Sequence, residues 1–254
     1  MGNILCSSSS ESRARCFVAF ALESEMTKPV RRWLQRQGFL VKAEFGLPWG
    51  ICDLVGLSFD ESRVAKRMAF RQHRPIGPIQ RVELLRLIPD QETGRTITFN
   101  RLRAFTEGTF FASDLDHELR TLIADRFVIL GKNGSLQKQN GWAPMHDRIV
   151  AVELKLSRVS EALAQAVSNR AFATESYVAL PMKVATRLSD SARYSKFKAA
   201  GIGVLGVTPI SCRLISQAFE TIEPDVTLQM HCVERFWRTR GSSASTAARC
   251  ARAF

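Results

Sequence analysis

The chain contains the run Arg148-Ile-Val-Ala-Val-Glu-Leu-Lys155, in which β-branched residues alternate with other residues. Alternation with a period of two predicts a strand, and residues two apart on a strand share a face, so Glu153 and Lys155 lie side by side. A second short apolar run, Trp49-Gly-Ile-Cys-Asp-Leu-Val-Gly56, follows Pro48 and carries Asp53. If the two strands belong to one sheet, two carboxylates and an ammonium group meet at its end.

These residue types suit a divalent metal ion and a phosphodiester. Mg²⁺ is usually held by one or two carboxylates together with water and substrate oxygens, and it generates a hydroxide nucleophile while offsetting charge on the phosphoryl oxygens. Asp53 and Glu153 are the expected Mg²⁺ ligands, and Mn²⁺ is expected to substitute. Lys155 would orient the attacking water or stabilise the pentacovalent phosphorus. The structural alternative is a solvated cross-strand charge pair, which Glu-x-Lys sequences often form.

The order of these motifs resembles the PD-(D/E)XK phosphodiesterase superfamily, which has the restriction-endonuclease fold. The matching segments are Gly50–Gly56, Val152–Lys155, a helix at Glu161–Val167, a strand at Ser176–Pro181 and the apolar run Gly201–Val207. The resemblance covers roughly residues 17 to 57 and 147 to 219. It implies an Mg²⁺-dependent DNA endonuclease that uses direct attack by water, with no covalent intermediate.

The resemblance also implies two supporting residues. In such nucleases the helix after the lysine often carries a glutamine that faces the site, and Gln165 occupies that position. A glutamate from the first helix commonly contributes, for which Glu23 and Glu25 are available and Glu25 is the preferred candidate. Each has an ordinary explanation as well, since acids in a first helical turn are stabilised by the helix dipole and Gln165 could be a solvated helix residue.

The chain departs from the family pattern in two places. Cys52 stands where the motif has its proline, a loosely kept position with little chemical consequence. Asp53 and Glu153 are a hundred residues apart, whereas neighbouring core strands are usually joined by short connections. The sequence therefore predicts an inserted segment between the two strands.

The predicted insertion, residues 81–140, has the pattern of a winged helix-turn-helix. Helices are expected at 81–88, at 98–105 and from Ser113, followed by a β-hairpin at 127–139 with its turn at Gly131-Lys-Asn-Gly134. The segment has nine basic and eight acidic residues, and the first turns of its third helix carry Asp114, Asp116 and Glu118. Because a recognition helix normally meets DNA with its N-terminal turn, DNA positioning, docking of a partner protein and dimerisation all remain open.

The charge of the chain favours a polyanionic partner. The net charge is +12 and the pI about 10.0, and lysines and arginines that displace counterions provide sequence-independent affinity for DNA. An expected helix and its exit at 61–74 place several basic residues directly after the Asp53 strand, and others lie on the first helix and near 187–198. The expected nucleic-acid contacts are Arg63, Lys66, Arg67, Arg71, Lys132 and Lys138.

The remaining features describe an ordinary α/β protein. Six cysteines without paired spacing favour buried small side chains in a reducing, cytoplasmic compartment over structural zinc or disulfides. No apolar run is long enough to cross a bilayer. Four scattered histidines give no metal-ligand pattern, and His146 is the least implausible of them for catalysis because it precedes the Glu153 strand. Residues 1–16 and 238–254 are expected to be disordered tails.

The predicted architecture is an α/β core with a restriction-endonuclease-like mixed sheet flanked by helices, made of residues 17–80 and 141–237 and interrupted by the insert. The expected elements are helices at 25–37, 159–170 and 182–199 and strands at 39–45, 51–57, 148–155, 175–180 and 203–208. A homodimer would place two sites on opposite strands, although the sequence does not show one. Two alternatives remain: a nucleic-acid-binding or regulatory protein on an inactive nuclease fold, and a nuclease subunit that needs a partner protein.

Overall fold

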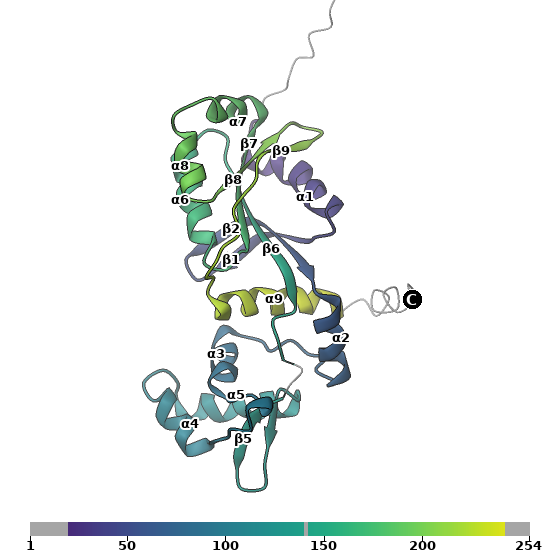
Figure 1. The fold of residues 1–254 in the computed structure, drawn as a ribbon, viewed down its shortest axis with the longest axis vertical. Coiled ribbons are helices and arrows are strands. Elements are labelled where there is room, and N and C mark those ends of the chain that lie inside the picture. Colours follow the sequence, from purple (N-terminus) through teal and green to yellow (C-terminus); the bar gives the residue numbers. More distant parts are fainter. Residues whose placement is uncertain (1–19, 140–141, 242–254) are drawn as a thin grey trace, which may run out of the picture.

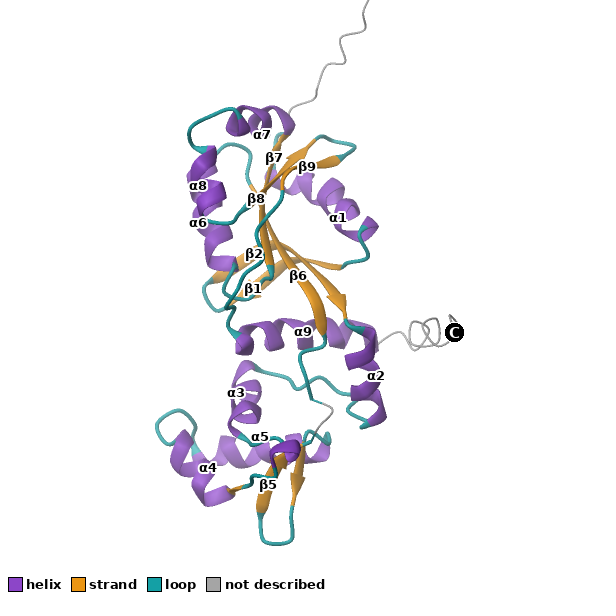
Figure 2. Ribbon diagram, in the orientation of Figure 1, coloured by secondary structure: helices purple, strands orange, loops and turns teal. Residues whose placement is uncertain are grey.

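The chain folds around a six-stranded mixed sheet. A computed structural model describes residues 20–139 and 142–241. The strand order is β1-β2-β6-β7-β8-β9, with β6, β7 and β8 parallel and the other neighbours antiparallel. The strands are β1 (Leu40–Leu47), β2 (Gly50–Phe59), β6 (His146–Leu154), β7 (Glu175–Pro181), β8 (Gly203–Val207) and β9 (Cys212–Ser216). Because helices cover both faces (Figure 2), the expected α/β class with a mixed, helix-flanked sheet is confirmed.

Alternating strand residues pack against helices on opposite faces of the sheet. In β7, Tyr177 and Ala179 join a cluster with α1 (Thr27–Arg36), whereas Val178 and Leu180 join one with α6 (Val159–Asn169). The remaining core helices are α2 (Glu61–Ala69), α7 (Met182–Ser189), α8 (Tyr194–Ala199) and α9 (Val226–Gly241). A strand buried on both faces needs apolar residues at nearly every position, and this explains the continuous run in β6.

The segment between β2 and β6 forms a separate lobe. It contains the expected three helices and hairpin, together with a two-residue strand that makes the hairpin a three-stranded antiparallel sheet in the order β3-β5-β4. Its elements are α3 (Ile79–Leu87), η2 (Gln91–Thr93), β3 (Ile97–Thr98), α4 (Phe99–Thr106), α5 (Ala112–Ala124), β4 (Val128–Leu130) and β5 (Ser135–Lys138). Figure 1 shows this inserted lobe beyond α9, at the end of the sheet where β2 ends and β6 begins.

Helix α9 joins the two lobes. Met230 belongs to the hydrophobic cluster of the inserted lobe, while Phe236 and Trp237 belong to the cluster beneath β2 and β6. Between them, Glu234 forms a buried ion pair with Arg67 of α2 and accepts the backbone N–H of Ile76 at 2.7 Å. The sequence analysis missed this helix and began a tail at residue 238. The helix continues to Gly241, and the rest of both expected tails lies outside the described residues.

Two other elements differ from the expectation. The single helix expected at 182–199 is broken into α7 and α8, and the hydroxyl groups of Ser189 and Ser191 bond to the carbonyls of Thr186 and Leu188 at the break. Serine side chains that bond to nearby carbonyls offer the backbone an alternative to the helix. The edge strand β9 was not expected, because its half-exposed residues lack a clear alternation.

Candidate functional site

Asp53 and Glu153 lie on neighbouring antiparallel strands. The register pairs Leu54 of β2 with Val152 of β6, so Asp53 and Glu153 are the next residues at this end of the ladder. Asp53 Oδ2 accepts the backbone N–H of Leu154 at 2.7 Å. The hundred residues that separate the two acids in the sequence include the inserted lobe. The chain leaves β2 and re-enters β6 at the opposite end of the sheet, so the lobe lies far from the two acids.

Lys155 follows directly after β6 and is held by two carboxylates. Its side chain is buried, with Nζ 3.7 Å from Glu23 Oε2 and 4.0 Å from Glu161 Oε1. Its backbone N–H donates to the carbonyl of Ala179 at 3.1 Å, which ties the residue to β7. Glu23 is fixed in turn because its Oε1 accepts the N–H of Leu156 at 3.2 Å. The ammonium group is thus positioned beside the two strand carboxylates by the first helical turn and by α6.

Burial makes the charged forms of both strand carboxylates unfavourable. Loss of solvent is the main cause that raises the pKa of Asp53, against a lowering contribution from the Leu154 N–H. Loss of solvent likewise raises the pKa of Glu153 to about 7, with a further upward contribution from the negative charge of Asp53. Two neighbouring carboxylates in a partly desolvated site resist simultaneous ionisation. A bound cation would relieve this repulsion.

Helix α6 presents three polar residues at successive turns, Glu161, Gln165 and Asn169. Residues four apart lie on one helix face. Glu161 reaches Lys155, and Asn169 Nδ2 donates to Glu153 Oε1 at 2.6 Å. Gln165 lies between them, and its Oε1 atom is buried without a hydrogen-bond partner in the described part of the chain. An orphaned buried acceptor is unusual and marks a position where a water molecule or ligand would be bound.

The donor set fits a hard cation such as Mg²⁺. Asp53 and Glu153 provide carboxylate oxygens, and Gln165 provides a buried, unused carbonyl oxygen. Within residues 20–139 and 142–241, no group of three or more His, Cys, Asp or Glu side chains could hold a metal ion. Mg²⁺ commonly takes only one or two protein carboxylates and keeps several water ligands, so a pair of acids is sufficient.

The sequence preference for Glu25 over Glu23 is corrected by the geometry. Glu25 Oε2 accepts the backbone N–H of Ala21 at 2.8 Å, so this exposed side chain caps the short 3₁₀ turn η1 (Glu23–Met26). Glu23 is the residue that approaches Lys155. The two glutamates are two positions apart in a tight helical turn, and this spacing points them in different directions.

Two of the six expected nucleic-acid contacts are wrong. Arg67 is fully buried in its ion pair with Glu234, and its guanidinium group lies 4.7 Å from the ring centre of Trp237. Lys138 is also buried, with Nζ 3.4 Å from Asp90 Oδ2. Each of these side chains is paired with a carboxylate inside the protein, as buried charged groups usually are. Neither side chain is exposed enough in this structure to contact a phosphate.

The other four expected contacts remain at the surface. Arg63 donates to the Pro144 carbonyl at 3.0 Å, and Lys66 lies 3.6 Å from Glu92, while Arg71 and Lys132 are exposed. Their location differs from the expectation that they flank the site. Helix α2 begins eight residues after Asp53, about 26 Å along an extended strand. The basic residues after β2 therefore lie at the end of the sheet opposite to the carboxylates.

Two further residues, Asn169 and Glu161, belong to this region and were not expected there, and Cys52 is closer to the carboxylates than its position in the motif suggested. Asn169 and Glu161 contact Glu153 and Lys155, and their spacing of four from Gln165 was the signal that could have identified them. Cys52 lies beside Glu153: Asn169 Nδ2 is 3.5 Å from its Sγ, and burial raises the pKa of the thiol well above its usual value. His146 lies at the start of β6, away from Glu153, and burial lowers its pKa to about 4.

Comparison with known proteins adds little to this geometry. Among the described residues, no helix combines the length and the apolar character that a membrane span requires. No family model and no curated protein matches the chain. A solved structure of a protein of unknown function from Silicibacter pomeroyi is 13% identical, with a TM-score of 0.41, and the match covers 91% of this chain and 94% of that one. At this level the similarity identifies neither a family nor a function.

Proposed function

We propose that this chain is an Mg²⁺-dependent endonuclease of the PD-(D/E)XK type that hydrolyses DNA phosphodiester bonds. The proposal rests chiefly on one observation. Asp53 and Glu153 lie side by side at the end of two neighbouring strands, and Lys155 comes directly after the second of these strands. Acid, acid and lysine at the end of a mixed sheet form the pattern that this chemistry needs. A structural charge pair between Glu153 and Lys155 would not require a second, partly buried carboxylate beside Glu153.

Each side chain has a role in the proposed reaction. When bound by Asp53 and Glu153, Mg²⁺ would supply an activated water and offset the charge that grows on the phosphoryl oxygens. The Lys155 ammonium group, held by Glu23 and Glu161, stabilises that charge from the side of α6. Gln165 Oε1 accepts a hydrogen bond from the attacking water and so orients it. The water oxygen bonds to phosphorus and gives up a proton to solvent, the phosphorus–oxygen ester bond breaks, and the leaving oxygen takes a proton from solvent.

The arrangement of elements supports the fold part of the proposal. A helix, a β-hairpin, a strand and a helix leading to a parallel strand follow one another as α1, β1–β2, β6, α6 and β7. The inserted lobe has the order helix, strand, helix, helix and hairpin, which is that of a winged helix-turn-helix. We therefore propose a restriction-endonuclease-like fold for the chain, with a winged-helix-like insertion after its second strand.

The polyanionic partner is supported by the charge of the chain rather than by the inserted lobe. The first turns of α5 carry Asp114, Asp116 and Glu118, and the nearby arginines are already engaged, since Arg120 pairs with Asp116 at 2.6 Å and Arg81 pairs with Glu118. An acidic N-terminal turn repels phosphate. We therefore assign DNA affinity mainly to exposed basic residues of the core, with Lys132 at the hairpin turn as a further backbone contact.

A plasmid-nicking assay tests the proposal. Wild type should nick supercoiled DNA with Mg²⁺ or Mn²⁺ and not with EDTA, while Asp53→Asn, Glu153→Gln and Lys155→Met should each lower the rate by about a hundredfold or more. Glu223→Gln, which changes an exposed glutamate in the loop before α9, is the matched control and should keep full activity. Wild type that binds DNA without cutting it would instead favour the binding protein on an inactive nuclease fold.

A further inference from the structure

The inserted lobe exposes large apolar side chains on neighbouring elements. Phe105 is 62% exposed, Phe111 80% and Leu87 47%, although Phe110, which lies between the first two along the chain, packs against the core of the lobe. These four residues, here called the Phe105 patch, come from α3, from α4 and from the link between α4 and α5. An exposed patch of this kind on a small lobe usually marks a binding surface.

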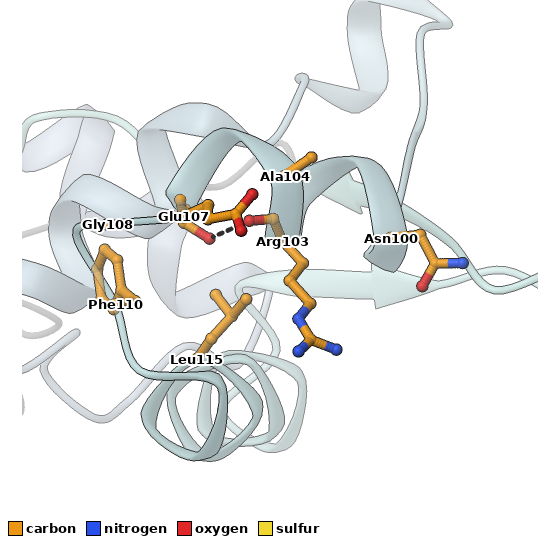
Figure 3. A pocket seen from close by; sticks show the side chains of 8 residues that line it. Asn100, Arg103, Ala104, Glu107, Gly108, Phe110 and Leu115 are labelled. Atoms are coloured by element: carbon orange, nitrogen blue, oxygen red, sulfur yellow. Dashed lines mark hydrogen bonds between the residues drawn. The ribbon is translucent and has the colours of Figure 1, made fainter.

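Two hollows flank the patch. One, of about 480 Å³, is lined by Leu87, Phe105 and Phe110 together with residues of α3 and Thr227 of α9. The other, of about 460 Å³, lies between α4 and α5 and is lined by Phe110, Arg103 and Leu115. Figure 3 shows the Arg103 side chain extending from α4 toward α5 in this second hollow, with the Phe110 ring at one side. The surface therefore offers projecting aromatic rings next to cavities that could receive a ring.

The charges around the hollows cancel. The first hollow is lined by Glu83 and Arg86, and the second by Arg103 and Glu107. Two bases and two acids leave this surface without net charge, so two copies of it can meet without strong mutual repulsion. A nucleic acid would instead require a surplus of bases, which this surface lacks.

The net charge of the whole chain also favours contact between copies through the inserted lobe. Each copy carries a net charge of +12, so two copies repel each other over most of their surface. The inserted lobe, with nine basic and eight acidic residues in 81–140, is the region where two copies can approach at the lowest electrostatic cost. Exposed aromatic side chains supply the favourable free energy, since burying a phenylalanine ring removes a large apolar area from water.

We propose that the Phe105 patch is a two-fold dimerisation surface and that its occupant is the patch of a second copy of this chain. The interface is independent of whether the chain cleaves DNA. It leaves the Asp53–Glu153 end of each sheet free, because the inserted lobe lies at the opposite end.

Sedimentation equilibrium or light scattering of the full chain tests the interface. We expect a dimer that Phe105→Glu and Phe111→Glu weaken by about tenfold or more, because a carboxylate replaces a buried ring. Arg103→Glu should also weaken it, since the rim then becomes acidic on both copies. Ile222→Glu, at a residue that is 91% exposed in the loop before α9, is the matched control and should leave the dimer intact.

Weaker dimerisation can be distinguished from misfolding of the variants. Both patch variants alter exposed side chains, so their thermal unfolding should match that of wild type and a weaker dimer cannot be attributed to misfolding. A chain that stays monomeric up to concentrations on the order of 100 µM overturns the proposal. So does a dimer that is indifferent to both phenylalanine substitutions, and neither result depends on cleavage activity.

Discussion

Replacement of Glu153 by glutamine should stabilise the metal-free protein at alkaline pH. Burial and the Asp53 carboxylate raise the pKa of Glu153 from 4.5 to about 7. A shift of about 2.5 pH units corresponds to about 3 kcal/mol of unfavourable free energy in the folded state once the group is ionised. Glutamine removes this cost and can still accept the hydrogen bond from Asn169 Nδ2 through its own carbonyl oxygen.

Proton binding to Glu153 determines how the free energy of unfolding changes with pH. Below pH 4.5 the carboxyl group is protonated in both the folded and the unfolded chain, so it adds no pH dependence. Between pH 4.5 and about 7 the folded chain holds a proton that the unfolded chain has lost, so the free energy of unfolding falls by about 1.4 kcal/mol per pH unit. Above pH 7 the loss is complete. The advantage of Glu153→Gln should therefore grow through this window and then stay constant.

Thermal unfolding in EDTA at pH 4.5, 6 and 8 measures the effect. About 3 kcal/mol corresponds to a rise in melting temperature on the order of 6 °C for a chain of this size at pH 8, with little difference at pH 4.5. Adding Mg²⁺ should stabilise wild type and leave the variant nearly unchanged, because the variant has lost a ligand. A variant that is less stable than wild type at pH 8, or equally stabilised by Mg²⁺, would refute the reasoning. Glu223→Gln should show neither effect.

Four further outcomes follow from the contacts described above. Asn169→Ala should weaken Mg²⁺ binding in calorimetry by about tenfold or more, because Glu153 loses the donor that orients it, and a normal affinity would exclude the positioning role. Glu23→Gln should slow DNA nicking whereas Glu25→Gln should not, and the reverse ranking would return Glu25 to the site. Arg67→Met should lower the free energy of unfolding in urea by about 3 to 5 kcal/mol, because it leaves Glu234 buried without its partner. The double variant that also carries Glu234→Gln should recover most of this stability. DNA affinity measured by fluorescence anisotropy should fall steeply with salt, and a flat dependence between low and moderate salt would count against a phosphate-contacting surface.

Local sequence patterns were sufficient for the elements near the carboxylates. The alternation in Arg148–Lys155 predicted β6, and the spacing of Ala162 and Ala166 suits a helix packed on a sheet, as α6 is. The pairing of the Asp53 strand with the Glu153 strand has no local signal. It was inferred from a family resemblance, and the register at Leu54 and Val152 agrees with it.

Long-range pairing explains what the sequence could not supply. Arg67 resembles a solvated helix residue among its basic neighbours, and only the position of Glu234, far along the chain, accounts for its burial. Helix α9 escaped detection because its apolar residues serve two lobes, so Met230 and Phe236 do not form one stripe that a helical period would reveal. Which of two glutamates faces Lys155 likewise depends on a single tight turn before α1.

Helix α9 packs against both lobes, and this limits how the architecture can be altered. Met230 of α9 is part of the hydrophobic core of the inserted lobe, so a fragment of residues 79–139 would expose part of that core to solvent. Deletion of the same residues would expose the apolar side chains of α9 that face the lobe. Grafting the lobe onto another scaffold, or excising it to obtain a minimal domain, would therefore require redesign of the C-terminal helix.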